Sequence, residues 1–88
     1  MATVTVTQQH IDDARHSTNP TDRSSNPIAR ATCEALGEEM GQYITNISVG
    51  SIQHVSGKIA TLPDKALEKL RSWYQHTEME PFIFTMDL

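Results

Sequence analysis

The chain contains few of the residues that mark specialised classes of protein. Its 88 residues include one cysteine, one tryptophan, two tyrosines, two phenylalanines and four glycines. The single cysteine, Cys33, cannot form an internal disulfide, which is typical of a protein from a reducing compartment. No apolar run approaches the roughly 20 residues that a membrane span needs, and the N-terminus lacks the basic start and long apolar segment of a signal peptide. We therefore expect a soluble, cytoplasmic protein that is not inserted in a membrane.

An excess of positive charge is also missing. Seven lysines and arginines stand against eleven aspartates and glutamates, the formal net charge is −4 at pH 7, and the basic residues form no run. Nucleic-acid-binding domains usually show a basic face, so direct nucleic-acid binding is not expected, although Lys65 and Lys69 leave room for a local patch. The acidic excess instead favours a negative field that attracts a basic protein partner.

The strongest periodic pattern lies at 62–76. One arc of a helical wheel there holds the apolar residues Ala66, Leu67, Leu70, Trp73 and Tyr74. This period is that of a helix with one buried face, and Pro63 and Asp64 suit its first turn. Trp73 is predicted to be the largest part of the core.

The remaining segments predict two more helices and five strands. Thr7 caps a short helix over 8–16, and Asn26 and Pro27 begin a second helix that is expected to end at Gly41, with Met40 on its apolar face. Strands are predicted where β-branched or aromatic residues alternate with polar ones, at 3–7, 43–49, 52–55, 58–62 and 82–88. The polar residues at about 17–25 predict an exposed loop.

The predicted order, β-α-α-β-β-β-α-β, indicates an α+β two-layer sandwich, with a mainly antiparallel sheet and helices on one face. If one short strand is ignored, the order is compatible with a ferredoxin-like split β-α-β variant, in which the first and last strands are neighbours. Residues 1–88 are long enough for one small domain with a modest core.

The sequence gives only weak evidence for catalytic or metal-binding residues. His10, Asp13 and His16 have a spacing like that of metal ligands, but on a helix the outer two lie about 120° apart. Cys33 lies on the apolar face of its helix, where a thiol behaves as a small hydrophobic group, and no oxyanion hole or orienting acid accompanies it. We therefore expect no enzyme activity, no metal and no cofactor.

A protein-binding role is left for the polar surface. Its candidate residues come from the first helix, the 17–25 loop and the polar side of the second helix, and they are Asp12, Asp13, Asp22, Arg23, Glu34, Glu38 and Glu39. These residues are mostly acidic, so the partner is expected to be basic.

The chain also carries a set of short motifs. An opening Thr-Val strand runs into His10-Ile11-Asp12, and Pro27-Ile28-Ala29, Leu62-Pro63 and Pro81-Phe82-Ile83-Phe84 with Asp87 follow. In this combination the chain resembles small uncharacterised proteins of bacteriophages and their bacterial hosts. Proteins of that group often carry cysteine directly before the Pro-aliphatic-Ala step, where this chain has Asn26. The resemblance implies a phage context, and hence the cytoplasm of a host cell, without an activity.

Together these observations lead to the hypothesis of a non-enzymatic, phage-type protein. It would bind and inhibit a host protein or ribonucleoprotein complex, such as a CRISPR-Cas or other defence effector, as anti-CRISPR proteins do. One alternative is an oligomer that binds a small ligand, or sequesters a nucleotide, in a pocket at its interface. Another is an accessory protein-interaction domain.

Overall fold

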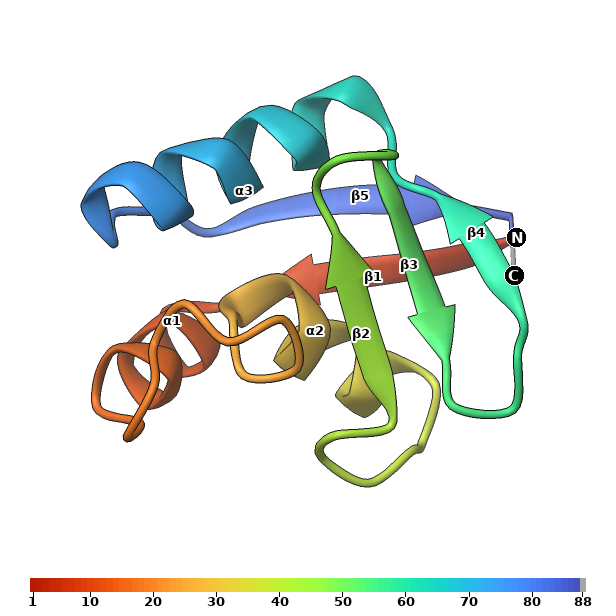
Figure 1. Cartoon of the computed structure of the whole chain (residues 1–88), viewed down its shortest axis with the longest axis horizontal. Helices are drawn as coiled ribbons and strands as arrows, with labels where there is room; N and C mark the ends of the chain where they lie inside the picture. The colour runs from red at the N-terminus through yellow and green to blue at the C-terminus, as the bar shows by residue number, and fades with distance from the viewer. Residues whose placement is uncertain (88) are drawn as a thin grey trace.

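The computed structural model describes residues 1–87 and has the element order β1-α1-α2-β2-β3-β4-α3-β5 (Figure 1). The elements are β1 (Ala2–Val6), α1 (Gln8–Arg15), α2 (Pro27–Ala35), β2 (Tyr43–Asn46), β3 (Ser51–His54), β4 (Ile59–Thr61), α3 (Asp64–His76) and β5 (Phe82–Met86). The predicted α+β class and the order of helices and strands are confirmed. Leu88, which was expected in the last strand, lies outside the described residues.

The first and last strands of the chain pair with each other. β1 and β5 are antiparallel, with Val4 opposite Phe84, and their alternation buries the side chains of Val4, Val6, Phe82, Phe84 and Met86. β2, β3 and β4 form a separate antiparallel meander. A ferredoxin-like arrangement needs one continuous sheet, whereas the described strands form two.

One hydrophobic core is shared by all eight elements. Trp73 on α3 is the largest of its fully buried side chains, as the helical period predicted. In Figure 1, α3 runs alongside the β1–β5 pair. The β2–β3–β4 meander crosses in front of the β1 and β5 strands. The apolar arc of α3 is confirmed at Ala66, Leu70 and Trp73, which are fully buried.

The second helix ends earlier than predicted. α2 stops at Ala35, and Gly37, not Gly41, takes the left-handed conformation that ends it, with φ of +68°. The N–H of Glu38 donates to the Cys33 carbonyl at 2.8 Å, and that of Gly37 to the Glu34 carbonyl at 3.3 Å. These two bonds are a Schellman motif, which satisfies the last carbonyls of a helix. The prediction that the helix continues to Met40 was therefore wrong, and Met40 is half-exposed.

Other boundaries also differ from the sequence-based expectation, and two of them change the place of a named residue. β2 ends at Asn46 rather than Val49, because the chain turns at 47–50 and Gly50 takes a φ of +66°. Val49, expected within this strand, is exposed in the turn. Pro63 precedes α3 as its N-cap residue instead of lying in its first turn. Helix boundaries commonly shift by one or two residues in this way.

Candidate functional site

The residues expected to bind a partner come from four segments of the chain. Asp12 and Asp13 lie on α1, and Glu34 lies near the C-terminal end of α2. The other four lie in the connections on either side of α2, and they are Asp22, Arg23, Glu38 and Glu39. Their role in binding a partner stays a prediction.

Most of these carboxylates contact neighbouring groups of the same chain. Asp12 and Asp13 accept hydrogen bonds from the glutamine four residues earlier, at 2.9 and 2.7 Å. Asp22 accepts the backbone N–H and the hydroxyl of Ser24 at 2.8 and 2.7 Å, and these bonds hold its pKa below the usual range. Within residues 1–87, the side chains of Glu39 and Arg23 make no hydrogen bond or ion pair.

Glu34 belongs to an interaction that the sequence analysis missed. His10 is buried, and its Nδ1 accepts the backbone N–H of Thr7 at 3.0 Å, while the Thr7 hydroxyl accepts the N–H of His10. Because Nδ1 is an acceptor, the neutral ring carries its proton on Nε2 and donates it to the Glu34 carboxylate. A histidine thus completes the capping box of α1, where glutamate or glutamine is usual.

The histidines and the cysteine considered as metal ligands or nucleophile have structural contacts in the fold. His10 is committed to this capping box, and His16 Nδ1 lies 2.8 Å from the Asp12 carbonyl at the end of α1. Cys33 is fully buried. Across residues 1–87, no group of three histidine, cysteine or acidic side chains is placed to hold a metal ion.

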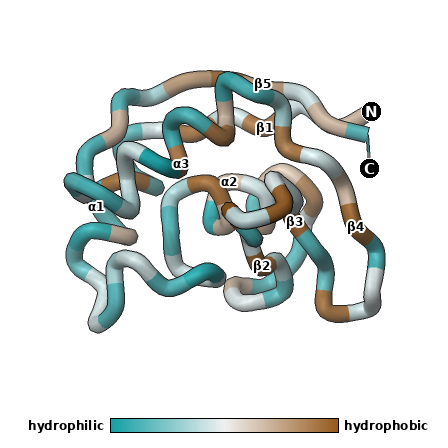
Figure 2. The backbone as a smooth tube through the Cα atoms, turned by 45° about the horizontal axis from the view of Figure 1, so that its top comes forward, coloured by the Kyte–Doolittle hydropathy of each residue, from teal (hydrophilic) through white to brown (hydrophobic). Residues whose placement is uncertain are grey.

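The outer face of the β2–β3–β4 meander carries two exposed isoleucines among polar residues. Tyr43, Thr45 and Ile52 point into the core, so the alternate residues point outward. In one row across the sheet Ile44 lies opposite Gln53, and Gln53 opposite Ile59. Ile44 is 36% exposed, Val55 58% and Ile59 62%. Figure 2 colours the backbone by hydropathy, and both apolar and polar positions occur along β3 and β4. We call Ile44, Gln53, Val55 and Ile59 the outer sheet face.

Two acidic residues, Glu38 and Glu39, lie in the connection before β2, near the Val55 end of the meander. The Val55 N–H donates to the Gln42 carbonyl at 2.9 Å, and the Gln42 N–H to the Glu39 carbonyl at 3.3 Å. The Glu39 backbone is therefore joined to this end of the sheet through Gln42. Glu38 is adjacent to it, with its carboxylate 3.5 Å from His54 Nε2 on β3. Burial raises the pKa of Tyr43, and the Glu38 carboxylate adds to the shift.

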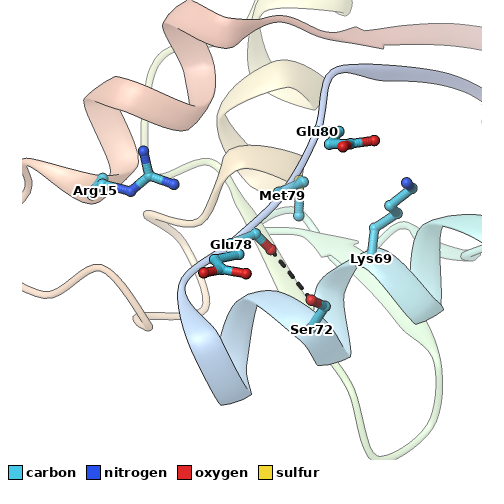
Figure 3. A pocket seen from close by; sticks show the side chains of 6 residues that line it. All are labelled: Arg15, Lys69, Ser72, Glu78, Met79 and Glu80. Atoms are coloured by element: carbon cyan, nitrogen blue, oxygen red, sulfur yellow. Dashed lines mark hydrogen bonds between the residues drawn. The ribbon is translucent and has the colours of Figure 1, made fainter.

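Several cavities also open on the surface. Figure 3 shows one of about 360 Å³ beside α3, lined by Arg15, Lys69, Ser72, Glu78, Met79 and Glu80. Two basic and two acidic side chains surround it, so it does not favour a ligand of one sign. A second cavity, of about 430 Å³, is lined by Arg23, Arg71 and Tyr74 with further polar residues. We call it the arginine cleft.

The Lys65 and Lys69 patch considered from the sequence lies over an aromatic ring. The two ammonium nitrogens are 5.9 and 5.6 Å from the centroid of the Phe82 ring. Cations at this distance are attracted by the face of the ring. Both lysines line a shallow cavity between α3 and β5.

No protein-family model, curated protein or solved structure matches this chain. Within residues 1–87, none of the helices has the length and apolar character required to cross a bilayer.

Proposed function

We propose that the protein is a non-enzymatic, phage-type binding protein that inhibits a host protein complex, and that it docks through the outer sheet face. The observation that carries this proposal is the exposure of three branched side chains, Ile44 and Ile59 on either side of Gln53 in one row of the sheet and Val55 just after β3. No element of residues 1–87 covers them. An aliphatic side chain contributes about 1.5–3 kcal/mol when it moves from full exposure to full burial. These three side chains are 36–62% exposed, so each would contribute a part of that value on docking.

The acidic residues near the meander support a basic partner. Glu38 and Glu39 precede β2 near the Val55 end of the meander, and the chain has a net charge of −4. A basic surface flanking an apolar patch complements this arrangement. Nucleic-acid-binding channels of defence effectors, CRISPR-Cas complexes among them, have such basic surfaces. Occupying the channel would block the nucleic acid and inhibit the effector.

The test is expression of a tagged copy in a bacterial host with intact defence systems, followed by co-purification and light scattering. Ile59→Thr removes an exposed apolar group from the outer sheet face and keeps a β-branched residue in the strand. Ile83→Thr is the matched control, because Ile83 is 55% exposed on β5 of the other sheet. We expect Ile59→Thr to lose the partner and to restore nucleic-acid binding by the effector, while Ile83→Thr behaves as wild type.

Three results would separate this proposal from its alternatives. Equal capture by Ile59→Thr and wild type would exclude the outer sheet face as the docking surface. A captured partner that keeps its full activity would indicate an accessory interaction domain instead of an inhibitor. A homo-oligomer without a protein partner would contradict the inhibitor and favour the small-ligand alternative.

A further inference from the structure

We propose that the arginine cleft is a binding site for a nucleoside monophosphate. The cleft lies between α3, the 17–25 loop and the turn after β2. Residues from all three segments line it, among them Arg23, Ile47, Ser48, Arg71, Tyr74 and Gln75. Its volume of about 430 Å³ lies in the range of about 300–1,000 Å³ that is usual for small-molecule sites.

The charge of the cleft is opposite to that of the chain. Arg23 and Arg71 both line it, and no carboxylate does. Neither arginine takes part in an ion pair in the part of the chain that the structure describes. A guanidinium group binds phosphate oxygens through two parallel N–H donors, so the two arginines suit a phosphate dianion.

Buried hydrogen bonds hold the loop side of the cleft in place. The Arg23 carbonyl accepts the Thr45 N–H at 3.0 Å, the Thr45 hydroxyl at 3.1 Å and the Asn26 side-chain amide at 3.1 Å. Thr45 and Asn26 are fully buried. The backbone that carries the Arg23 side chain is therefore fixed before any ligand binds, which lowers the entropy cost of binding.

The same network holds the helix side of the cleft. The Tyr74 hydroxyl lies 3.1 Å from the Thr45 hydroxyl, and this contact positions the Tyr74 ring on α3. The Tyr74 ring and the Ile47 side chain supply apolar surface for a base, since aromatic rings stack on bases of any sequence. Ser48 and Gln75 supply polar groups for the base edge or the ribose.

A free nucleotide fits these observations better than a nucleic-acid chain. Two arginines neutralise about two phosphates, and the affinity of a protein for a polyanion rises with the number of phosphates that it neutralises. The chain as a whole is acidic and repels a longer backbone.

The experiment is calorimetric titration at low salt with the four common nucleoside monophosphates, adenosine, inorganic phosphate and a short single-stranded oligonucleotide. We expect at least one monophosphate to bind, and adenosine not to bind. Arg71→Gln and Arg23→Gln should each weaken binding by about 10- to 100-fold, the range for hydrogen bonds to charged groups. Lys65→Gln is the control, because it removes one positive charge from α3 at a residue that does not line the cleft.

Each contrary outcome overturns the proposal. No binding of any monophosphate at millimolar concentration excludes the site, and so does equal weakening by Lys65→Gln and Arg71→Gln. If inorganic phosphate binds as tightly as every monophosphate, the nucleoside does not contribute to binding and the site is not a nucleotide site. Tighter binding of the oligonucleotide indicates a nucleic-acid surface instead. Circular dichroism of each variant checks its fold, and Ile59→Thr should bind nucleotide as wild type does, so this test is independent of the docking surface.

Discussion

The indole of Trp73 donates a hydrogen bond of 2.7 Å to the backbone carbonyl of Pro20. This bond joins the largest core side chain on α3 to the middle of the 17–25 loop, which the sequence predicted to be exposed. Several residues of that loop are half-buried, Pro20 among them. The loop is therefore attached to the core, and it forms one side of the arginine cleft.

Trp73→Phe should loosen this loop. The change removes the indole donor and leaves space in the core, and we expect it to lower the free energy of unfolding by about 2 kcal/mol. Trypsin should then cleave after Arg23 faster under native conditions. Leu70→Val is the control, because it perturbs the same core and keeps the Trp73–Pro20 bond. Equal cleavage rates in the two variants would show that Trp73 does not hold the loop.

Substitutions at Asn26 should separate its two structural roles. Its side-chain oxygen accepts the Ala29 N–H at 2.9 Å and caps α2, while its amide donates to the Thr45 hydroxyl at 2.8 Å. Asn26→Ala removes both interactions at a fully buried position, and we expect a loss of about 2–4 kcal/mol. Serine is close to alanine in volume, but unlike alanine it keeps a side-chain oxygen that can cap the helix.

The measurement for Asn26 is urea denaturation of both variants. Asn26→Ser should be more stable than Asn26→Ala by about 0.5–2 kcal/mol, the contribution of an N-cap. If the two variants were equally stable, the capping bond to Ala29 would contribute nothing.

Two glycines with nearly equal positive φ should differ in their tolerance of alanine. Gly37 and Gly50 have φ of +68° and +66°. A Cβ at Gly37 would meet no atom within 4 Å, whereas at Gly50 it would lie 3.2 Å from Leu67 Cδ2. We expect Gly37→Ala to cost about 1–2 kcal/mol from the left-handed conformation alone, and Gly50→Ala to cost more. Thermal denaturation of the pair tests this order, and a larger loss for Gly37→Ala would contradict it.

Asp22 should make stability depend on pH in the acidic range. The Ser24 bonds lower the folded-state pKa of Asp22 below its unfolded value of about 3.9. The stabilisation is therefore fully present above the unfolded pKa and is lost as the pH falls through the folded pKa. Asp22→Ala should be less stable than wild type at pH 7, and the difference should shrink as the pH is lowered.

Urea denaturation of wild type and Asp22→Ala over a pH series measures this difference, and an NMR titration of the Asp22 carboxyl measures its pKa directly. A constant difference between the two proteins down to the folded pKa would contradict the role assigned to the Ser24 bonds. Asp22 was expected to bind a partner. Its hydrogen bonds to Ser24 also give it a structural role in this turn.

The sequence alone determined which segments are helices and strands and which of their faces are buried. The period of Ala66, Leu70 and Trp73 predicted the buried face of α3, and the alternation of residues at 82–88 predicted the strand β5. These patterns are readable because a helix or strand repeats its side-chain directions over a few residues. Element boundaries were less accurate: Gly37 and Gly41 are both glycines that accept a positive φ, and local sequence does not tell which one ends the helix.

Only the tertiary structure decided how these elements meet. It paired β1 with β5, separated them from the β2–β3–β4 meander, and left Ile44 and Ile59 on an uncovered face. It also brought Arg23 of the loop and Arg71 of α3 to one cleft, although the sequence analysis singled out only Arg23. Strand pairing and clefts depend on contacts between residues far apart in the chain, and no local period encodes them. Both candidate sites of this protein combine residues that are far apart in the chain.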